Sequence, residues 1–314
     1  MKRLLFTAGG SPGMEAFYRY LKDKYELFFA DMNPTNISPT IPDSRKYQIP
    51  SASSELFISH ISELCDRLAV DLLIPGVDEE LVLVQGQFQG ECQTKVFLPK
   101  PEFVSAMLNK YTMNKALEER GIDVPQTVLA DDYAFNPVAP VILKPAFGRG
   151  SRGVFALPSD NLVKPLYDAI RHTSSSSWII QENVEGDEFT VQMVSTPSSA
   201  LLGIFPLKVY EKRGSTVSAV MQHDEDVIKY CKSIHEAFRP DGCYNIQLIK
   251  RPSGEVLAFE INPRISTTTV LCVAAGLDPF LSFLETQNKP SPLKTVPTIK
   301  LHRHWVNQIT VVDQ

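Results

Sequence analysis

The chain has 314 residues, 43% of them hydrophobic and 21% charged, which is ordinary for a globular protein and argues against a disordered chain. A chain of this length can bury a sizeable core and suits two or three subdomains around one cleft. The formal net charge of −5 gives no reason to expect a nucleic-acid or anionic-membrane surface, so we expect small-molecule partners. No apolar run approaches the roughly 18 residues of a membrane span.

Cysteine usage indicates a reducing compartment. The five cysteines are an odd number without C-x-x-C spacing, which indicates neither a disulfide framework nor a zinc site. The apolar run after the basic start is too short for a signal peptide, so we expect a cytoplasmic protein. The cysteines are Cys65, Cys92, Cys231, Cys243 and Cys272.

The first hundred residues alternate between short apolar runs and segments with helical apolar spacing. In chain order, we expect a strand over residues 4–8, a helix over 14–25, a strand over 25–31, a helix over 55–68 and a strand over 70–75. Such alternation predicts a parallel sheet with helices on both faces, so the chain to about residue 101 is predicted to be Rossmann-like.

The loop after the first strand, AGGSPG at residues 8–13, matches the A-x-G-x-x-G form of a dinucleotide fingerprint, and Asp31 lies near the offset of a ribose carboxylate. The first glycine is replaced, and Pro12 stands inside the loop. A contact to a small substrate is therefore favoured, and an NAD(P)-linked oxidoreductase is kept as an alternative.

A glycine-rich loop follows a lysine in the middle of the chain. We expect a helix over residues 109–121, a strand from residue 125, and strands over residues 138–144 and 154–157 on either side of FGRGSRG. Lys144 ends an apolar strand, so its ammonium would need an anionic partner. The three glycines offer flexible backbone N–H groups to phosphate oxygens, although the GK[ST] of a Walker loop is missing. A mobile hairpin tip is the alternative.

The segment WIIQENVEGDEFTVQMV, residues 178–194, combines an apolar strand, an acidic turn and a second strand. Backbone groups at residues 182–184 are suited to reading an adenine edge, and Glu188 is suited to accepting hydrogen bonds from a ribose. Taken alone, the segment is equally an acidic hairpin. Longer alternating strands follow it.

Polar side chains occupy what otherwise looks like a buried hairpin in YNIQLIKRPSGEVLAFEINPRIS, residues 244–266. Side chains alternate between the two faces of a strand, so Glu260, Asn262 and Arg264 should share one face. By the same rule, Phe259 and Ile261 should share the other face.

The pairing of the two strands brings these polar groups together. A turn at residues 253–254 would pair Gln247 with Glu260 and Asn245 with Asn262. Paired oxygen ligands suit a hard cation such as Mg²⁺, and a neighbouring arginine suits phosphate. A solvated sheet face is the alternative, but such faces are usually rich in Lys, Glu and Thr.

Five segments stand in an order that resembles the ATP-grasp superfamily. They are IPGVDEEL at residues 74–81, NKYTMNKALEERGIDVPQT at residues 109–127, the glycine-rich loop, the Glu-x-x-x-Gly hinge and the strand ending in EINPR. The chain most closely resembles one synthetase unit of the carbamoyl-phosphate synthase large-subunit type, from about residue 2 to residue 283.

The resemblance implies an α/β fold with three parts. A Rossmann-like domain with a parallel sheet would occupy residues 1–105, a small lid subdomain residues 106–181, and a subdomain with an antiparallel sheet residues 182–314. The last part would carry the floor of a magnesium–nucleotide site.

The resemblance also implies roles for single residues, with ATP and Mg²⁺ as cofactors. Residues expected at the ATP phosphates are Lys110, Lys144, Gly148, Gly150, Ser151 and Gly153. Residues expected at the adenine and ribose are Glu182, Val184 and Glu188. Expected magnesium ligands are Gln247, Glu260 and Asn262. Arg264 would steady the transferred phosphoryl group, with Lys144 as the second catalytic residue.

Two positions depart from the family pattern. Carbamoyl-phosphate synthase has an arginine where this chain has Lys110, and Gln247 stands in place of an acidic residue, which lowers the charge of the metal site. Substrate contacts are expected on the loops at residues 76–80, 209–216 and 266–269.

The implied activity is that of a stand-alone ligase. It would activate a small carboxylate as an acyl phosphate and transfer it to an amine or another nucleophile. Complete carbamoyl-phosphate synthesis is not expected, because only one synthetase unit is present. An ATP-binding regulatory protein without turnover is the second hypothesis. The oligomeric state is open, with a homodimer as one alternative.

Overall fold

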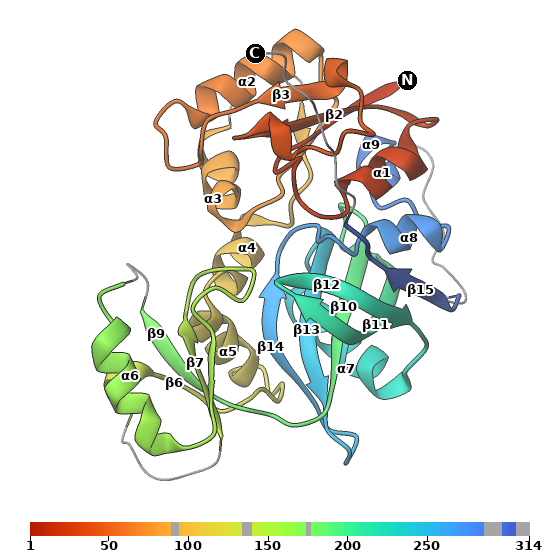
Figure 1. The fold of residues 1–314 in the computed structure, drawn as a ribbon. Coiled ribbons are helices and arrows are strands. Elements are labelled where there is room, and N and C mark those ends of the chain that lie inside the picture. The colour runs from red at the N-terminus through yellow and green to blue at the C-terminus, as the bar shows by residue number, and fades with distance from the viewer. Residues whose placement is uncertain (89–93, 134–139, 174–176, 286–296, 306–314) are drawn as a thin grey trace.

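The structure is a computed structural model that describes residues 1–88, 94–133, 140–173, 177–285 and 297–305. The described residues form a five-stranded, a four-stranded and a six-stranded sheet, in that order along the chain (Figure 1). The N-terminal sheet and its helices lie at one end of the molecule, and the other two sheets lie side by side at the opposite end.

The N-terminal sheet has the strand order β3-β2-β1-β4-β5, and every pair in it is parallel. Its side chains alternate between two covered faces: Leu4 and Phe6 of β1 pack with α1, whereas Leu5 packs with α2. The predicted parallel sheet with helices on both faces is confirmed. The elements are β1 (Lys2–Phe6), α1 (Met14–Leu21), β2 (Tyr25–Asp31), β3 (Lys46–Gln48), α2 (Phe57–Leu68), β4 (Leu72–Ile74), α3 (Asp78–Gln87) and β5 (Lys95–Val96), with 3₁₀ turns η1 (Pro34–Asn36) and η2 (Asp43–Arg45).

Some predicted boundaries in this part shift by a few residues. The first strand ends at Phe6 and does not reach Ala8, whose left-handed backbone with φ of 51° departs from the extended conformation of a strand. The predicted helix over residues 14–25 ends at Leu21, and Tyr25 instead begins β2. The predicted strand over residues 25–31 is confirmed at both ends.

The four-stranded sheet has the order β6-β9-β7-β8 and is antiparallel. Asn109 caps α5, because its side-chain oxygen accepts hydrogen bonds from the N–H groups of Tyr111 and Thr112. The predicted strand over residues 138–144 appears as β7, and residues 138 and 139 lie outside the described part. The elements are α4 (Pro101–Met107), α5 (Lys110–Glu118), β6 (Thr127–Leu129), η3 (Ala130–Asp132), β7 (Val141–Pro145), β8 (Phe155–Leu157), η4 (Asp160–Leu162), α6 (Val163–Ile170) and β9 (Trp178–Glu182).

The six-stranded sheet has the order β14-β13-β10-β11-β12-β15, with every pair antiparallel. One face packs on α7, and Phe280 joins the sheet to the N-terminal part through contacts with the rings of Phe6 and Phe97. The elements are β10 (Asp187–Ser195), β11 (Leu201–Arg213), β12 (Ser215–Met221), α7 (Glu225–Phe238), β13 (Gly242–Lys250), β14 (Val256–Asn262), α8 (Val270–Ala274), α9 (Leu281–Leu284) and β15 (Ile299–His302).

The β13–β14 hairpin has the predicted register, with Gln247 opposite Glu260 and Asn245 opposite Asn262. The prediction that Phe259 lies on the opposite face was wrong. A β-bulge next to Gln247 leaves Phe259 unpaired and turns it into the same cleft as Glu260.

The described helices are too short or too polar to cross a membrane. Cys65, Cys231, Cys243 and Cys272 are buried and form no disulfide with one another, and Cys92 lies outside the described residues. The predicted domain boundaries at residues 105 and 181 stay predictions.

Candidate functional site

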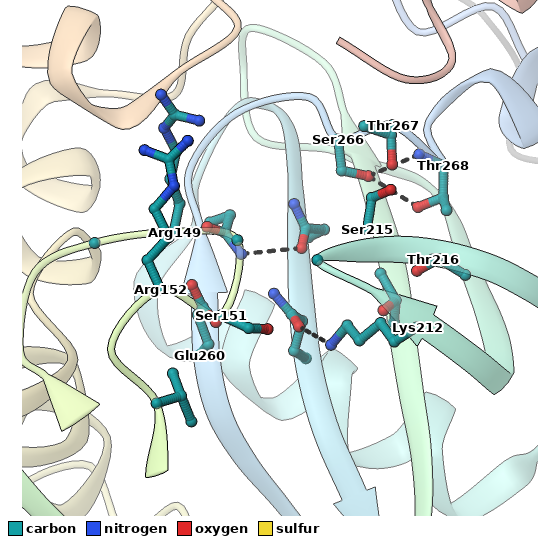
Figure 2. Close-up of a pocket in the computed structure, with 18 of the residues that line it drawn as sticks. Arg149, Ser151, Arg152, Lys212, Ser215, Thr216, Glu260, Ser266, Thr267 and Thr268 are labelled. Carbon is teal, nitrogen blue, oxygen red and sulfur yellow. Dashed lines mark hydrogen bonds between the residues drawn. The ribbon is translucent and has the colours of Figure 1, made fainter. Parts of the chain in front are cut away.

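A cleft of about 450 Å³ lies where the three sheets meet. The glycine-rich loop with Arg149 and Arg152 stands on one side, and the start of β12 with Ser215 and Thr216 stands opposite (Figure 2). The β13–β14 hairpin forms the floor, and loops of the N-terminal part close one end. All three predicted substrate loops, at residues 76–80, 209–216 and 266–269, contribute to the lining.

Two buried lysines point into this cleft from different elements. Lys110, the first residue of α5, is 6% exposed, and its Nζ donates to the carbonyl of Gly148 at 2.6 Å and lies 3.5 Å from Glu260 Oε1. Lys144 on β7 is 4% exposed, and its Nζ donates to Gln181 Oε1 at 2.8 Å. The structure thus brings both predicted phosphate-binding lysines to one place.

The environment of Lys144 is unusual for a lysine. Burial lowers its pKa to about 7, and the positive charges of Lys110 and Lys212 act in the same direction, while Glu260 opposes the shift. Nζ donates its hydrogen bonds to neutral oxygens, Oε1 of Gln181 and the carbonyl oxygen of Phe259. An anion placed beside this amine would restore its charge.

The floor carries a carboxylate and three side-chain amides. Asn262 Nδ2 donates to Asn245 Oδ1 at 3.3 Å, which leaves Asn262 Oδ1 free of that bond. Gln247 Oε1 accepts from Lys212 Nζ at 2.7 Å. Glu260 is partly buried and has the ion pair with Lys110 described above.

Lys212 is a cleft residue that the sequence analysis missed. It lies near the end of the long strand β11, where its Nζ contacts both Glu188 and Gln247 and stands 5.7 Å from the centre of the Phe259 ring. The only signal in the sequence was its place within residues 209–216, which were expected to contact substrate. Because position 247 holds the neutral Gln247 and not an acidic residue, Lys212 forms its ion pair with Glu188.

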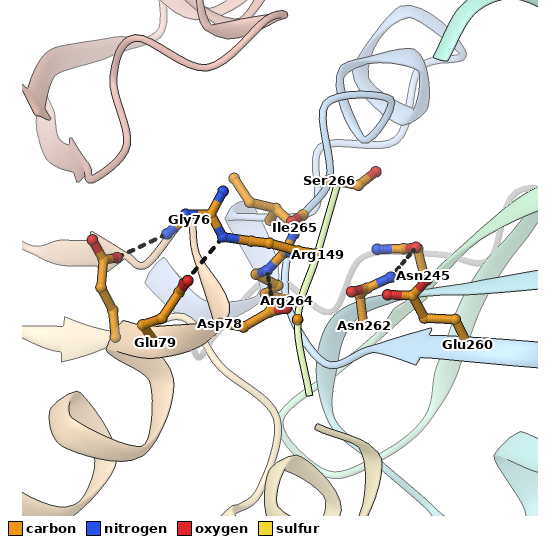
Figure 3. Close-up of polar contacts among 12 residues, drawn as sticks. Gly76, Asp78, Glu79, Arg149, Asn245, Glu260, Asn262, Arg264, Ile265 and Ser266 are labelled. Carbon is orange, nitrogen blue, oxygen red and sulfur yellow. Dashed lines mark hydrogen bonds and ion pairs between the residues drawn. The ribbon is translucent and has the colours of Figure 1, made fainter. Parts of the chain in front are cut away.

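Arg264 connects the floor to the N-terminal part. Its Nε donates to Asp78 Oδ1 at the start of α3, and both side chains are nearly buried (Figure 3). Next to this pair, Arg149 of the glycine-rich loop donates to Glu79 at 3.0 Å. Two consecutive acids of the segment VDEE therefore hold two arginines of the cleft.

A third acid of the same segment is buried behind them. Glu80 accepts hydrogen bonds from the hydroxyl of Thr7 and, at 3.3 Å, from the N–H of Gly76. Burial raises the pKa of Glu80 to about 7, although these hydrogen bonds oppose the shift. The carboxyl group fixes the loop that presents Asp78 and Glu79.

The glycine-rich loop has a backbone that side chains rarely allow. Gly148, Gly150, Ser151 and Gly153 have φ values of 142°, 67°, 58° and 67°. A Cβ at Gly148 or Gly150 would meet no atom within 4 Å, so conformation and not space explains these glycines. All but Gly153 line the cleft.

A model of the ATP-grasp domain family matches residues 107–268, which is more than half of the chain. The chain belongs to the ATP-grasp family. The match contains both buried lysines, the glycine-rich loop, the hairpin floor and Arg264, so the cleft is the part of the molecule that carries the family signature.

A curated relative of this ATP-grasp chain is the carbamoyl phosphate synthase large chain of Archaeoglobus fulgidus, at 24% identity over 289 residues. The match covers 84% of this chain and 26% of the relative, so the chain spans about a quarter of that protein's length.

Solved structures share the fold at low identity. The N5-carboxyaminoimidazole synthetase of Staphylococcus aureus, complexed with ADP, has a TM-score of 0.69 at 11% identity and covers 95% of this chain and 80% of its own. The biotin carboxylase domain of Hydrogenobacter thermophilus 2-oxoglutarate carboxylase, complexed with MgADP and bicarbonate, has a TM-score of 0.67 at 14% identity. The match covers 92% of this chain and 71% of that domain. An L-amino acid ligase of Bacillus licheniformis has a TM-score of 0.65 at 14% identity, and the match covers 90% of this chain and 73% of the ligase. These likenesses show the ATP-grasp fold.

The predicted adenine and ribose residues lie outside the lining of this cleft. Glu182 at the end of β9 is paired with Arg251, Val184 is partly exposed in the following turn, and Glu188 reaches the cleft through its contact with Lys212. Their roles in binding nucleotide stay predictions.

The floor of the ATP-grasp cleft fits a magnesium ion that is bound mainly by phosphate. Glu260 offers a carboxylate, and the orientation of Asn262 leaves its amide oxygen directed away from Asn245. Among the described residues, no group of three or more His, Cys, Asp or Glu side chains could hold a metal by itself. Mg²⁺ commonly takes one or two carboxylates and completes its shell with phosphates and water, which suits this donor set.

Proposed function

We propose that this ATP-grasp protein uses MgATP to activate a small carboxylate as an acyl phosphate and then transfers the acyl group to an amine or another nucleophile. The observation that supports this function best is the convergence of Lys110, Lys144 and Arg264 on a floor with Glu260 and Asn262. Three cationic groups around a magnesium-type donor set suit phosphoryl transfer, in which positioning and charge stabilisation supply most of the catalysis.

The reaction balances as two displacements. A carboxylate oxygen attacks the γ-phosphorus, the bond to the β–γ bridging oxygen breaks, and ADP leaves with the electron pair. The nucleophile then attacks the acyl carbon, loses a proton, and releases inorganic phosphate. Bound Mg²⁺ would supply charge neutralisation at the phosphate oxygens, held by Glu260 and Asn262 with Gln247 as a third oxygen donor.

The residues of the chain have separate tasks in this proposal. Lys110 and Lys144 hold phosphate oxygens, and the glycine-rich loop covers them and excludes water. Arg264 holds the transferred phosphoryl group, and Asp78 fixes the orientation of its guanidinium through the buried ion pair. The place of action that we propose is a reducing cytoplasm, on the ground of the odd number of cysteines without C-x-x-C spacing.

An NAD(P)-linked oxidoreductase has less support. The carboxylate of Asp31, expected at a ribose in that alternative, accepts hydrogen bonds from the N–H groups of Gly10 at 2.9 Å and Asn33 at 3.0 Å. It therefore fixes its own loop. Calorimetric titration separates the alternatives: MgATP should bind and NADPH should not, and tight NADPH binding without an ATP signal would reject the proposal.

Hydroxylamine trapping tests the chemistry, because hydroxylamine converts acyl phosphates into hydroxamates. The protein is incubated with MgATP, hydroxylamine and a panel of carboxylic acids, and hydroxamate and ADP are measured together. We expect one acid or class of acids to yield both products in equal amounts. Arg264→Ala should lose hydroxamate formation more than ATP affinity, whereas Arg19→Ala, on the exposed side of α1, should retain both. ATP binding without hydroxamate from any acid would favour the regulatory protein.

The homodimer stays a prediction. The biotin carboxylase domain of Hydrogenobacter thermophilus is described as a dimer in its crystal. Sedimentation of this chain at several concentrations would show whether it behaves in the same way.

A further inference from the structure

A buried hydrogen-bond network lies at the end of the cleft near the N-terminal part. Gln192 on β10 is fully buried, and its Nε2 donates to Ser266 Oγ at 2.8 Å and to Thr268 Oγ1 at 3.0 Å. Its Oε1 accepts from the hydroxyl of Thr269 at 2.7 Å. Every polar atom of the Gln192 side chain is therefore used to fix the loop at residues 266–269.

Counting donors in this network leaves one proton without an acceptor. Ser266 Oγ already accepts from Gln192 Nε2 and, at 3.2 Å, from the N–H of Thr268, which uses both of its lone pairs. We therefore assign its own proton to Thr268 Oγ1 at 2.9 Å, the nearer of two hydroxyl neighbours, since Thr269 Oγ1 lies at 3.5 Å. Thr268 Oγ1 then accepts twice, from Gln192 and Ser266, and its hydroxyl proton finds no acceptor among the described residues. Thr268 is 1% exposed and lines the cleft (Figure 2). A buried hydrogen-bond donor without an acceptor costs free energy, and an acceptor bound in the cleft would remove that cost.

The charges around this end of the cleft favour an anion as that acceptor. Glu260 is the only carboxylate among the described residues that line the cleft. Asp78 and Glu79 of the N-terminal part are each paired with an arginine, Arg264 and Arg149. An ammonium group placed here would find both acids already paired, whereas an oxyanion would find hydroxyl donors and those guanidinium N–H groups of Arg264 and Arg149 that take no part in the two pairs.

We propose that this end of the cleft binds a second anionic group of the substrate, so that the acid to be activated is a dianion such as a dicarboxylate or a phosphono acid. The inference rests on the proposed function, because it names the class of carboxylate that the site would phosphorylate. Thr268 O–H donates to the second anionic group. Gln192 acts through Ser266 and Thr268 and is a positioning residue.

Matched ligands test the proposal on the full-length wild-type chain. Succinate, butyrate and γ-aminobutyrate share four carbons and differ only in the terminal group, which is a carboxylate, a methyl or an ammonium. Glutarate, pentanoate and δ-aminopentanoate repeat the comparison with one more carbon, and phosphonopropionate presents a phosphonate. Dissociation constants are measured by calorimetry with Mg²⁺ and a non-hydrolysable ATP analogue present.

We expect at least one dianion to bind about tenfold or more tightly than its methyl and ammonium counterparts. Thr268→Val, which keeps the shape and removes the hydroxyl, should abolish most of this preference, and Thr268→Ser should retain it. Ser195→Ala is the matched control, because it removes a buried hydroxyl of the same strand as Gln192 that bonds to the carbonyls of Pro240 and Gly242 away from the cleft.

Equal binding within each matched set, preference for the ammonium, or no binding of any of these acids would each overturn the inference. Binding of the ATP analogue is measured in the same titrations. If the analogue binds and no dianion is preferred, only the substrate class is wrong. If the analogue itself does not bind, the proposed function fails as well.

Discussion

Binding of MgATP should draw a proton onto Lys144. The pKa of this buried amine is lowered to about 7 from an ordinary value of 10.5, so roughly 90% of it is neutral at pH 8 in the empty protein. Phosphate oxygens beside Nζ favour the ammonium and should return the pKa toward its ordinary value of 10.5, so binding at pH 8 should take up about 0.9 proton. For the same reason, the affinity should fall with a slope approaching tenfold per pH unit between pH 7 and pH 9.

Calorimetry in buffers with different ionisation enthalpies measures this uptake directly. The ligand is a non-hydrolysable ATP analogue with saturating Mg²⁺, whose phosphates are fully ionised at pH 8 and take up no proton themselves. Lys144→Met should remove most of the uptake together with much of the affinity, whereas Lys232→Met, on the exposed side of α7, should change neither. Tight binding to the wild-type chain at pH 8 without proton uptake would refute the assignment of Lys144 to the phosphates.

Three further predictions concern stability and motion. Asp78→Ala should lower the free energy of unfolding in urea by roughly 3–5 kcal/mol, because it leaves the Arg264 guanidinium buried and unpaired; a loss below about 1 kcal/mol would contradict this. Glu80 has a raised pKa, so its contribution to stability is present below pH 4.5 and is lost as the pH rises through about 7. Between pH 5 and pH 8, the free energy of unfolding of Glu80→Gln should therefore rise relative to that of the wild type by on the order of 3 kcal/mol. Parallel curves of the free energy of unfolding against pH for the two proteins would count against this. Amide hydrogen exchange over residues 147–153 should slow when the ATP analogue binds, and unchanged exchange would argue against a lid.

Local patterns in the sequence were sufficient for much of the fold. The run YELFFAD predicted β2 at both ends because a strand covered on both faces is continuously apolar. The Ser-Gly pair at residues 253–254 predicted a turn, and that turn predicted the register that places Gln247 opposite Glu260. In the structure Gly254 has a positive φ of 92°, which suits a turn. These features depend on residues close together in the chain.

The parts that could not be predicted depend on contacts between distant segments or on irregular backbone. A bulge turned Phe259 into the cleft, and strict alternation does not reveal a bulge. Lys212 became a cleft residue through a partner on another strand, Gln247, which lies 35 positions away. The ion pair of Arg264 with Asp78 joins residues 186 positions apart, so neither motif alone indicated it.

The central claim is that a carboxylate oxygen attacks the γ-phosphorus of ATP. Its most direct test uses the acid identified by hydroxamate trapping, labelled with ¹⁸O in its carboxylate, and follows the label into inorganic phosphate by mass spectrometry during turnover with the nucleophile. Formation and breakdown of an acyl phosphate predict one ¹⁸O atom in each phosphate released, and Glu260→Gln should reduce the labelled and total phosphate together. Unlabelled phosphate at an undiminished rate of ADP formation would contradict the account.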